Sequence, residues 1–343
     1  MSQAAPPVSV LLPARNAAET LPAALESIAR QTDPDFELIV VEDRSEDATL
    51  DVLRAAAAED PRVRVLRAPA AGRGGDLVGA LEQARRAARG RFLLRMDADD
   101  LAHPERLARC RALLEADPRV AAAGCLVRSF PEAQLRPGRL RYDAWLNGLR
   151  RHEDMARERF VESPLAHPSV LLRADAVAQV GGYRRFQGPE DYDLWLRLLA
   201  AGWRLAKADR VLHFWREAPG RLSRLDPRYG PAGMARARAD ALAALARRER
   251  RALALVGAGT AGRRLARLLL ERGVPVPYFL DTDPKKVGRA PHGVPVLEHH
   301  TGMRARRGEL LVTCLNAWGA RARARSWLTE AGLVEGVDFF LGG

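Results

Sequence analysis

Residues 8–43 read VSVLLPARNAAETLPAALESIARQTDPDFELIVVED, and this stretch decides the fold of the first part of the chain. The apolar run Val8–Leu12 stops at Pro13, which is typical of a short buried strand. Thr20–Arg30 carries apolar residues at helical spacing, and Phe36–Val41 is a second apolar run. A strand, a helix and a strand in this order predict a right-handed βαβ unit with parallel strands.

The alternation of strands and helices continues beyond this unit. We predict further helices at 49–59, 77–88, 104–115 and 192–201, and further strands at 63–66, 92–94, 120–127 and 169–172. Strands that alternate with helices of about 10 to 12 residues indicate an α/β domain with a mostly parallel sheet flanked by helices. We expect this first domain to span residues 1–233, with a less regular stretch at 130–166.

A second α/β pattern follows a long Ala- and Arg-rich helix, predicted at 234–251 and interpreted as a connector. The sequence VGAGTAG at 256–262 fits G-x-G-x-x-G between a predicted strand and a predicted helix. An acid follows the next strand, where dinucleotide-binding folds hold ribose hydroxyls. This nucleotide-type loop comprises Gly257, Gly259, Gly262 and Asp281. We predict a small Rossmann-like domain at 252–343, which either binds a nucleotide or sugar nucleotide or is an unliganded module for docking or dimerisation.

The chain has 343 residues, of which 47% are hydrophobic, and a formal net charge of +12. This composition excludes a mostly disordered chain and allows two domains. No apolar run approaches the roughly 20 residues that span a bilayer, and the N-terminus lacks the pattern of a secretory signal. Three scattered cysteines agree with a reducing compartment. We therefore expect a cytoplasmic protein that makes at most peripheral contact with the inner face of the membrane.

The positive charge allows an anionic partner. Aromatic residues make up only 6% of the chain, and the arginines are spread over many helices instead of one stripe. Both features count against a nucleic-acid binder, so we expect no nucleic-acid partner.

Acidic residues gather where predicted strands end or a predicted helix begins: Glu42-Asp43, Asp97–Asp100 and Glu190-Asp191. Ligands of open parallel sheets bind beyond the carboxyl ends of the strands. Two carboxylates one residue apart, Asp97 and Asp99, suit Mg²⁺ or Mn²⁺, which take carboxylate oxygens together with substrate phosphates. The sequence therefore predicts a metal site here, although a single Asp in such a place also fits a helix cap or a turn.

These acids lie in three stretches, 8–49, 89–107 (RGRFLLRMDADDLAHPERL) and 188–202 (GPEDYDLWLRLLAAG), and a fourth stretch at 167–183 reads HPSVLLRADAVAQVGGY. In this order and spacing, they resemble family 2 glycosyltransferases. The resemblance covers residues 8 to about 216. It implies a GT-A fold and an inverting enzyme that uses a nucleotide-diphospho-sugar, usually a UDP-linked one.

The resemblance also implies roles for individual residues. Asp99 matches the metal ligand, Asp97 a contact to the ribose or to the same metal, and Asp191 the catalytic base. The nucleotide side comprises Pro13, Ala14, Arg15, Asn16, Glu42, Asp43 and Arg73. Asp43 matches the acid that hydrogen-bonds the base; Glu42 stands where Asp is commoner, and the pattern around Arg73 is altered.

Four further side chains are secondary candidates, and three of them, His213, His167 and Trp195, have a structural alternative. His213 follows an apolar run and is a candidate third metal ligand or phosphate contact, whereas a lone histidine is more often structural. We expect His167 near the acceptor or the diphosphate, unless it fixes a turn. Glu190 and Trp195 are placed on the acceptor side; Trp195 shares a helical face with Asp191, and core packing explains it as well.

These residues fit sugar transfer with inversion, in which one carboxylate takes the proton of the acceptor hydroxyl and a cation stabilises the leaving diphosphate. We predict a transferase that uses Mn²⁺ or Mg²⁺ and acts on a glycan, lipid-linked or other acceptor. The C-terminal domain would hold a nucleotide or form a homodimer. Two alternatives are an NAD(P)-dependent oxidoreductase acting through that domain and a non-catalytic glycan- or nucleotide-binding scaffold.

Overall fold

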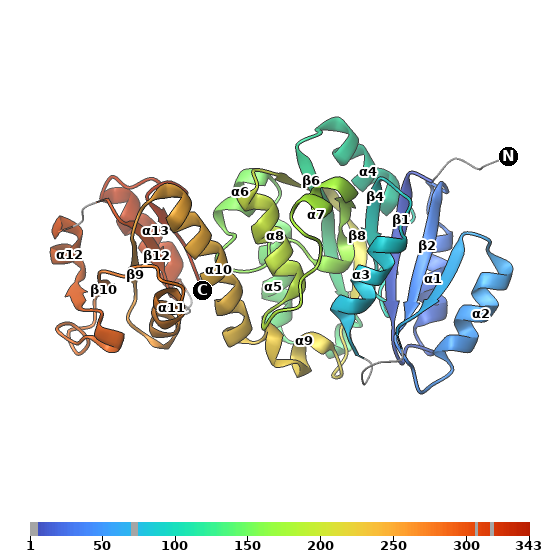
Figure 1. Cartoon of the computed structure of the whole chain (residues 1–343), viewed down its shortest axis with the longest axis horizontal. Coiled ribbons are helices and arrows are strands. Elements are labelled where there is room, and N and C mark those ends of the chain that lie inside the picture. Colours follow the sequence, from blue (N-terminus) through green and yellow to red (C-terminus); the bar gives the residue numbers. More distant parts are fainter. Residues whose placement is uncertain (1–5, 70–74, 306–307, 316–318) are drawn as a thin grey trace. The chain divides into compact units, whose positions relative to one another are not determined.

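The computed structural model describes residues 6–69, 75–305, 308–315 and 319–343. The chain folds into two compact units, and each is built from segments that are separate in sequence. The first unit contains Met1–His152, Leu165–Arg185 and Ala201–Arg221. The second contains Glu153–Pro164, Phe186–Ala200 and Leu222–Gly343. The chain order of these segments can be followed by colour in Figure 1.

The first unit is built on an eight-stranded sheet with the strand order β3-β2-β1-β4-β7-β6-β8-β5. The strands are β1 (Val8–Ala14), β2 (Phe36–Glu42), β3 (Val63–Arg67), β4 (Phe92–Arg95), β5 (Leu101–Ala102), β6 (Val120–Phe130), β7 (Leu171–Arg173) and β8 (Arg204–Arg216). Strands β3, β2, β1 and β4 run parallel, whereas β7 is antiparallel to both β4 and β6. The carboxyl ends of β1, β2 and β4 therefore share one edge of the sheet, as the sequence predicts.

Helices of the first unit follow the predicted alternation. They are α1 (Leu21–Ala29), α2 (Thr49–Glu59), α3 (Leu77–Ala87), α4 (Arg106–Ala116), α5 (Pro137–Gly148) and α7 (Ala174–Gln179), with short 3-10 turns η1 (Glu132–Gln134) and η2 (His167–Ser169). In α1, the buried residues Leu21, Ala24 and Ile28 lie at helical spacing and join the core of the sheet. α3 begins at Leu77 because the Asp76 side chain caps it by accepting from the amide of Gly79 at 3.0 Å.

The second unit contains a five-stranded, all-parallel sheet with the order β11-β10-β9-β12-β13. Its strands are β9 (Leu253–Val256), β10 (Phe279–Asp281), β11 (Val296–Glu298), β12 (Leu310–Thr313) and β13 (Phe339–Phe340). Its helices and 3-10 turns are α8 (Glu190–Ala200), α9 (Leu222–Leu225), η3 (Pro227–Tyr229), α10 (Pro231–Glu249), α11 (Thr260–Glu271), η4 (Pro291–Gly293), α12 (His299–Ala305) and α13 (Ala320–Glu330), and α6 (His152–Arg157) begins on the last residue of a first-unit segment. The expected α/β class, with a second, smaller parallel sheet, is confirmed.

The core of the second unit includes residues that come from the transferase-like part of the sequence. Phe160, Tyr192 and Leu196 pack with α10 and with strands of the parallel sheet. The helix predicted as a connector at 234–251 corresponds to α10, and it packs on α8. The predicted domain limits at 233 and 252 remain predictions, but α8, which carries Asp191, belongs to this compact unit.

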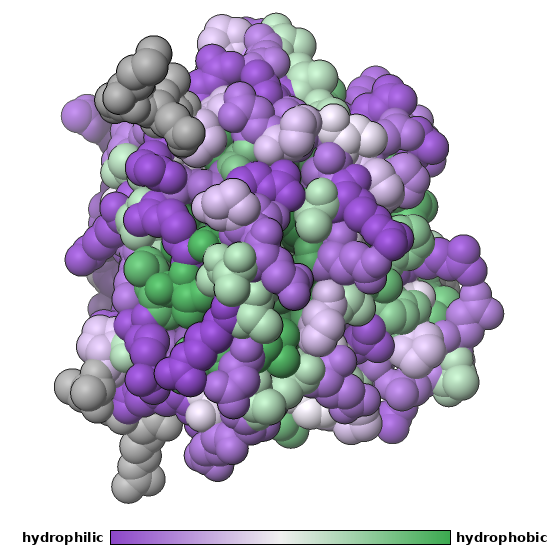
Figure 2. Space-filling view, turned by 90° about the vertical axis from the view of Figure 1, so that its right-hand side faces the viewer, coloured by the Kyte–Doolittle hydropathy of each residue, from purple (hydrophilic) through white to green (hydrophobic). Residues whose placement is uncertain are grey.

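Hydrophilic residues are spread over the whole face of the molecule shown in Figure 2, with hydrophobic residues in small groups between them. This agrees with a composition in which 29% of residues are charged. Within the described residues, no helix combines the length and apolar character needed to cross a bilayer.

Candidate active site

The ends of β1 and β2 form the part of the sheet edge predicted to hold the nucleotide. Asp43 is almost fully buried there, and its Oδ2 accepts from the amide of Asp76 at 2.8 Å. Its Oδ1 is also buried and has no hydrogen-bond partner in the described part of the chain. A buried acceptor without a donor is costly, so this oxygen suits a ligand that donates to it.

The other residues predicted to bind the nucleotide make contacts mainly within the loops that follow β1 and β2. The Glu42 carboxylate accepts from the amide of Ser45, and its Oε2 lies 3.4 Å from Nε of Arg67. Glu42 therefore stabilises the loop after β2. Asn16 has a positive φ of 48° and accepts from the amide of Glu46 at 2.8 Å. Pro13, Ala14 and Arg15 end β1 or directly follow it. Arg73 lies outside the described residues.

Three carboxylates crowd together just beyond β4. Asp97, Asp99 and Asp100 each offer an oxygen, and these atoms all lie within 4.8 Å of one another. Burial and the charges of its two neighbours raise the pKa of Asp99 to about 7. Burial and the charge of Asp97 likewise raise the pKa of Asp100 to about 7. Three carboxylates so close repel one another unless a cation offsets them, and an all-oxygen donor set fits Mg²⁺ or Mn²⁺.

Asp97 differs from the other two acids because it has a cationic partner. Burial acts to raise its pKa, but Arg95 beside it, together with His167 and Arg221, outweighs burial and lowers the pKa. The Arg95 guanidinium forms an ion pair with the Asp97 carboxylate. Asp97 is therefore the member of the cluster that stays ionised.

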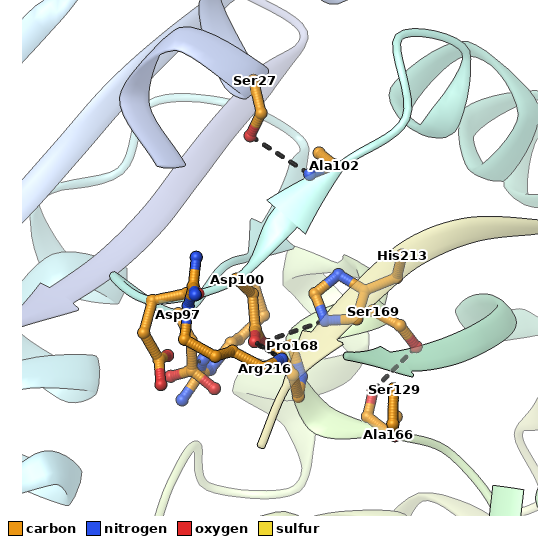
Figure 3. Close-up of polar contacts among 12 residues, drawn as sticks. Ser27, Asp97, Asp100, Ala102, Ser129, Ala166, Pro168, Ser169, His213 and Arg216 are labelled. Atoms are coloured by element: carbon orange, nitrogen blue, oxygen red, sulfur yellow. Dashed lines mark hydrogen bonds and ion pairs between the residues drawn. The ribbon is translucent and has the colours of Figure 1, made fainter. Parts of the chain in front are cut away.

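Asp100 is held from two sides by protein groups. Its Oδ2 lies 3.0 Å from Nε2 of His213, and its Oδ1 accepts from the amide of Arg216 at 2.7 Å (Figure 3). The Arg216 side chain also donates to the carbonyl of Asp99 at 2.7 Å. The other ring nitrogen of His213, Nδ1, lies 2.7 Å from Nη1 of Arg106. Both ring nitrogens of His213, predicted as a metal ligand or phosphate contact, are thus engaged by the protein.

His167 lies in η2 at the same edge of the first unit. Its Nε2 is 2.9 Å from the hydroxyl of Tyr183, and its charge acts on Asp97. The structure therefore brings His167 to the acidic cluster, and it also gives the ring a structural hydrogen bond. Both roles that the sequence left open are compatible with this position.

Glu190 and Asp191 form the first turn of α8 in the second unit. Glu190 is buried and accepts from the hydroxyl of Tyr229 at 2.6 Å, whereas Asp191 is half-buried, with Oδ2 3.5 Å from the hydroxyl of Ser163. Trp195 has no exposed surface. Its ring therefore has no open face in this structure on which a sugar could stack, and packing accounts for it.

The glycine-rich loop of the second unit joins β9 to α11. Gly257 has a φ of +106°, and a Cβ on Gly262 would collide with the carbonyl oxygen of Gly257, whereas Gly259 has open space around it. Asp281 accepts from the amide of Ala258 at 2.8 Å and lies 3.2 Å from Lys286. The predicted acid of this loop thus supports the loop itself.

A family model described as Glycosyl transferase family 2 matches residues 9–181, about half of the chain. The chain belongs to glycosyl transferase family 2. The putative glycosyltransferase EpsE of Bacillus subtilis (strain 168) is 31% identical over 216 residues, which cover 62% of this chain and 73% of that protein. The succinoglycan biosynthesis protein ExoO of Rhizobium meliloti (strain 1021) is 32% identical over 243 residues, 64% of each chain.

Two solved structures share the fold. The mannosyltransferase PcManGT from Pyrobaculum calidifontis, solved with GDP-Man and Mn²⁺, superposes with a TM-score of 0.50 at 22% identity, covering 79% of this chain and 70% of that one. S. aureus TarS 1-349 gives 0.54 at 18% identity, covering 77% and 71%. The family match includes Asp43, Asp97 and Asp99 and ends before Asp191. The protein is therefore a glycosyltransferase, and the role of Asp191 remains a proposal.

Two residues of this glycosyltransferase site are not predicted from the sequence. Arg95 and Arg106 lie beside the acidic cluster, yet arginine is so frequent in the chain that neither is conspicuous. Arg216 is a candidate from the sequence for a contact to the diphosphate or an anionic acceptor, with a solvated basic face as the alternative. One signal was present for Arg95, which interrupts the apolar strand FLLRM directly before Asp97. A charge inside a buried strand requires a partner, and the following acids supply it.

Proposed function

We propose that this glycosyltransferase moves a sugar from a nucleotide-diphospho-sugar to a hydroxyl of a glycan or lipid-linked acceptor, with inversion and with a divalent cation. The crowding of Asp97, Asp99 and Asp100 is the observation that most supports this proposal. In the absence of a cation the pKa of both Asp99 and Asp100 is about 7. A cation bound to Asp99 would favour the ionised form of its carboxylate.

The proposed ligands are Asp99 and Asp97, which lie at the carboxyl edge beside the predicted nucleotide residues. When bound, the cation would supply positive charge to offset the charge on the departing diphosphate. Asp43 would accept a hydrogen bond from the nucleotide base through its open Oδ1. Uracil and guanine both offer an N–H donor; we propose uracil because Asp43 matches the family's uracil-binding position.

Asp191 is the proposed general base. An oxygen lone pair of the acceptor attacks the anomeric carbon, the bond from that carbon to the diphosphate oxygen breaks, and its electron pair leaves with the diphosphate. Asp191 takes the acceptor proton. Attack opposite the leaving group inverts the configuration at the anomeric carbon.

A thermal-shift panel tests the donor. UDP-, GDP- and dTDP-sugars are each added with Mn²⁺ or with a chelator. At a ligand concentration about 100 times Kd, binding stabilises the protein by about 2.7 kcal/mol. We expect a Mn²⁺-dependent shift with a UDP-sugar that Asp99→Asn loses, while the matched surface variant Asp209→Asn keeps it. No shift with any nucleotide sugar would contradict the proposal.

For the second unit we propose that the loop at 256–262 binds the phosphates of a nucleotide. The support is a parallel sheet whose strand order reverses between β9 and β12, beside the glycine-rich turn. Gly259→Val is the sharpest variant, because its open surroundings accommodate a side chain that would occupy the place of a phosphate. We expect this variant to keep its melting temperature and lose any shift with UDP or NAD(H). An unchanged thermal shift in Gly259→Val would contradict nucleotide binding at this loop and would favour a docking or dimerisation role for the unit.

A further inference from the structure

Arg106 is a wholly buried guanidinium at the start of α4. It donates to the carbonyl of Pro168 at 3.0 Å and to the carbonyl of Arg95 at 3.3 Å, and it contacts His213 at 2.7 Å. No carboxylate forms an ion pair with it among the residues that the structure describes. A buried charge is retained only where its hydrogen bonds are well satisfied, and these three partners lie on three segments around the acidic cluster.

The contact with Arg106 fixes the protonation of His213. A guanidinium only donates hydrogen bonds, so Nδ1 of His213 must be the acceptor and the ring proton must reside on Nε2. That N–H points at Oδ2 of Asp100, 3.0 Å away. Burial and then the charge of Arg106 hold the pKa of His213 well below its ordinary value, which agrees with a neutral ring that has no nitrogen lone pair left for a metal.

Asp100 is in turn committed to the protein. Nε2 of His213 donates to its Oδ2, and the amide of Arg216 donates to its Oδ1. The Arg216 side chain then reaches the carbonyl of Asp99. The carbonyl of Arg95, two residues before Asp97, is held by Arg106. The backbone that carries Asp97 and Asp99 is therefore held at both ends by one connected network. Figure 3 shows its central contacts, from His213 and Arg216 to Asp100.

We propose that Arg106, His213 and Asp100 are positioning residues for the metal-binding pair Asp97 and Asp99, and that His213 does not ligate the metal. Asp100 joins β8 to the loop after β4 instead of contributing a ligand. This inference rests on the proposed function, because it concerns the metal site of the proposed reaction. It replaces the direct metal role predicted for His213 with an indirect one.

Electron spin echo envelope modulation on the Mn²⁺-loaded wild-type protein tests the ligand set without any turnover. We expect bound Mn²⁺ with no modulation from a directly coordinated nitrogen. Modulation from a ligating histidine nitrogen would overturn the inference and leave the proposed function intact. If the protein binds no Mn²⁺, alone or with UDP, the metal part of the proposed function fails and the inference fails with it.

Two variants of His213 separate positioning from ligation. The longer side chain in His213→Gln brings an amide N–H near the place of Nε2 and can still donate to Asp100, whereas His213→Asn is too short to do so. We expect His213→Asn to weaken Mn²⁺ binding about 10- to 100-fold, the range for residues that orient metal ligands, and His213→Gln to restore most of it. His103→Gln, in the loop between β5 and α4, is the matched control with wild-type affinity.

Equal losses of Mn²⁺ affinity in His213→Gln and His213→Asn would contradict a positioning role, since a ligand is lost in both. A melting curve followed by circular dichroism is recorded for every variant. If His213→Asn fails to fold, the modulation experiment on the wild-type protein still decides whether the histidine is a ligand.

Discussion

Replacing Asp99 by Asn removes one of three crowded carboxylates, and we expect it to stabilise the metal-free protein at pH 8. The pKa of Asp99 rises from 3.8 to about 7 in the folded protein, first because of burial and then because of Asp97 and Asp100. The folded state thus binds this proton more tightly than the unfolded state does. Its favourable contribution is complete below about pH 4 and is lost as the pH rises to about 7. Asparagine does not ionise and escapes this loss.

The magnitude follows from the shift of about three pKa units. Each unit corresponds to about 1.4 kcal/mol, so the ceiling on the gain in the free energy of unfolding is about 4 kcal/mol at pH 8. The buried asparagine amide carries a desolvation cost of its own, so we expect a gain of about 2 to 4 kcal/mol. For a unit of roughly 200 residues, that is a rise in melting temperature of about 4 to 16 °C.

The assay is differential scanning fluorimetry in a chelator at pH 4.5 and pH 8, on wild type and Asp99→Asn. The control is Asp209→Asn, which loses only an exposed ion pair with Arg150. We expect a large difference between Asp99→Asn and wild type at pH 8 and a small one at pH 4.5. An Asn variant no more stable than wild type at pH 8, or equally shifted at both pH values, would refute the reasoning.

Three further predictions concern the metal site, the hydrogen bond to Glu190 and the glycine-rich loop. Mn²⁺ should stabilise the wild-type protein increasingly from pH 5 to pH 8, because its ligand Asp99 has a pKa of about 7 and must lose its proton to bind the cation. A pH-independent Mn²⁺ shift in fluorimetry would contradict this. Tyr229→Phe removes one hydrogen-bond donor to buried Glu190 and should lower the free energy of unfolding by about 1 to 3 kcal/mol, measured by urea unfolding. An unchanged value would mean that this hydrogen bond contributes nothing to stability. Gly262→Val should disrupt the second unit, seen as lost helical circular dichroism or insoluble expression, because its side chain meets the carbonyl of Gly257; a normally folded variant would show that the helix can move away.

The sequence was sufficient for the parts of the site that depend on strand ends. Asp43 and Asp97 follow apolar runs, and parallel strands bring such ends to one edge, so their grouping was predictable. The sequence was not sufficient for Arg106, which looks like any other arginine of the predicted helix PERLARCRALLE. Its burial depends on contacts with η2 and β8, which are distant in sequence. Spacing likewise does not reveal which way an imidazole faces, so the sequence leaves His213 open between a metal ligand, a phosphate contact and a structural role, whereas the structure shows its ring between Arg106 and Asp100.

The division into units shows a second limit of sequence reasoning. The pattern of strands and helices predicts α8 as part of the first domain, although the family match ends before this helix. The buried side chains Tyr192 and Leu196 nevertheless pack with α10 in the second unit. Such packing depends on which apolar faces meet in three dimensions, and helical periodicity shows only that a face is apolar.

The most direct test of the central claim is the release of nucleoside diphosphate from a UDP-sugar, measured on wild type and Asp99→Asn with Mn²⁺ or with a chelator. Acceptor-dependent release is compared wherever an acceptor glycan is found. We expect release by wild type with Mn²⁺ and a loss of about 100-fold or more in Asp99→Asn or with the chelator. Release that is equally fast in the Asn variant, or unaffected by removal of the metal, would contradict a metal-assisted transferase built on Asp97 and Asp99.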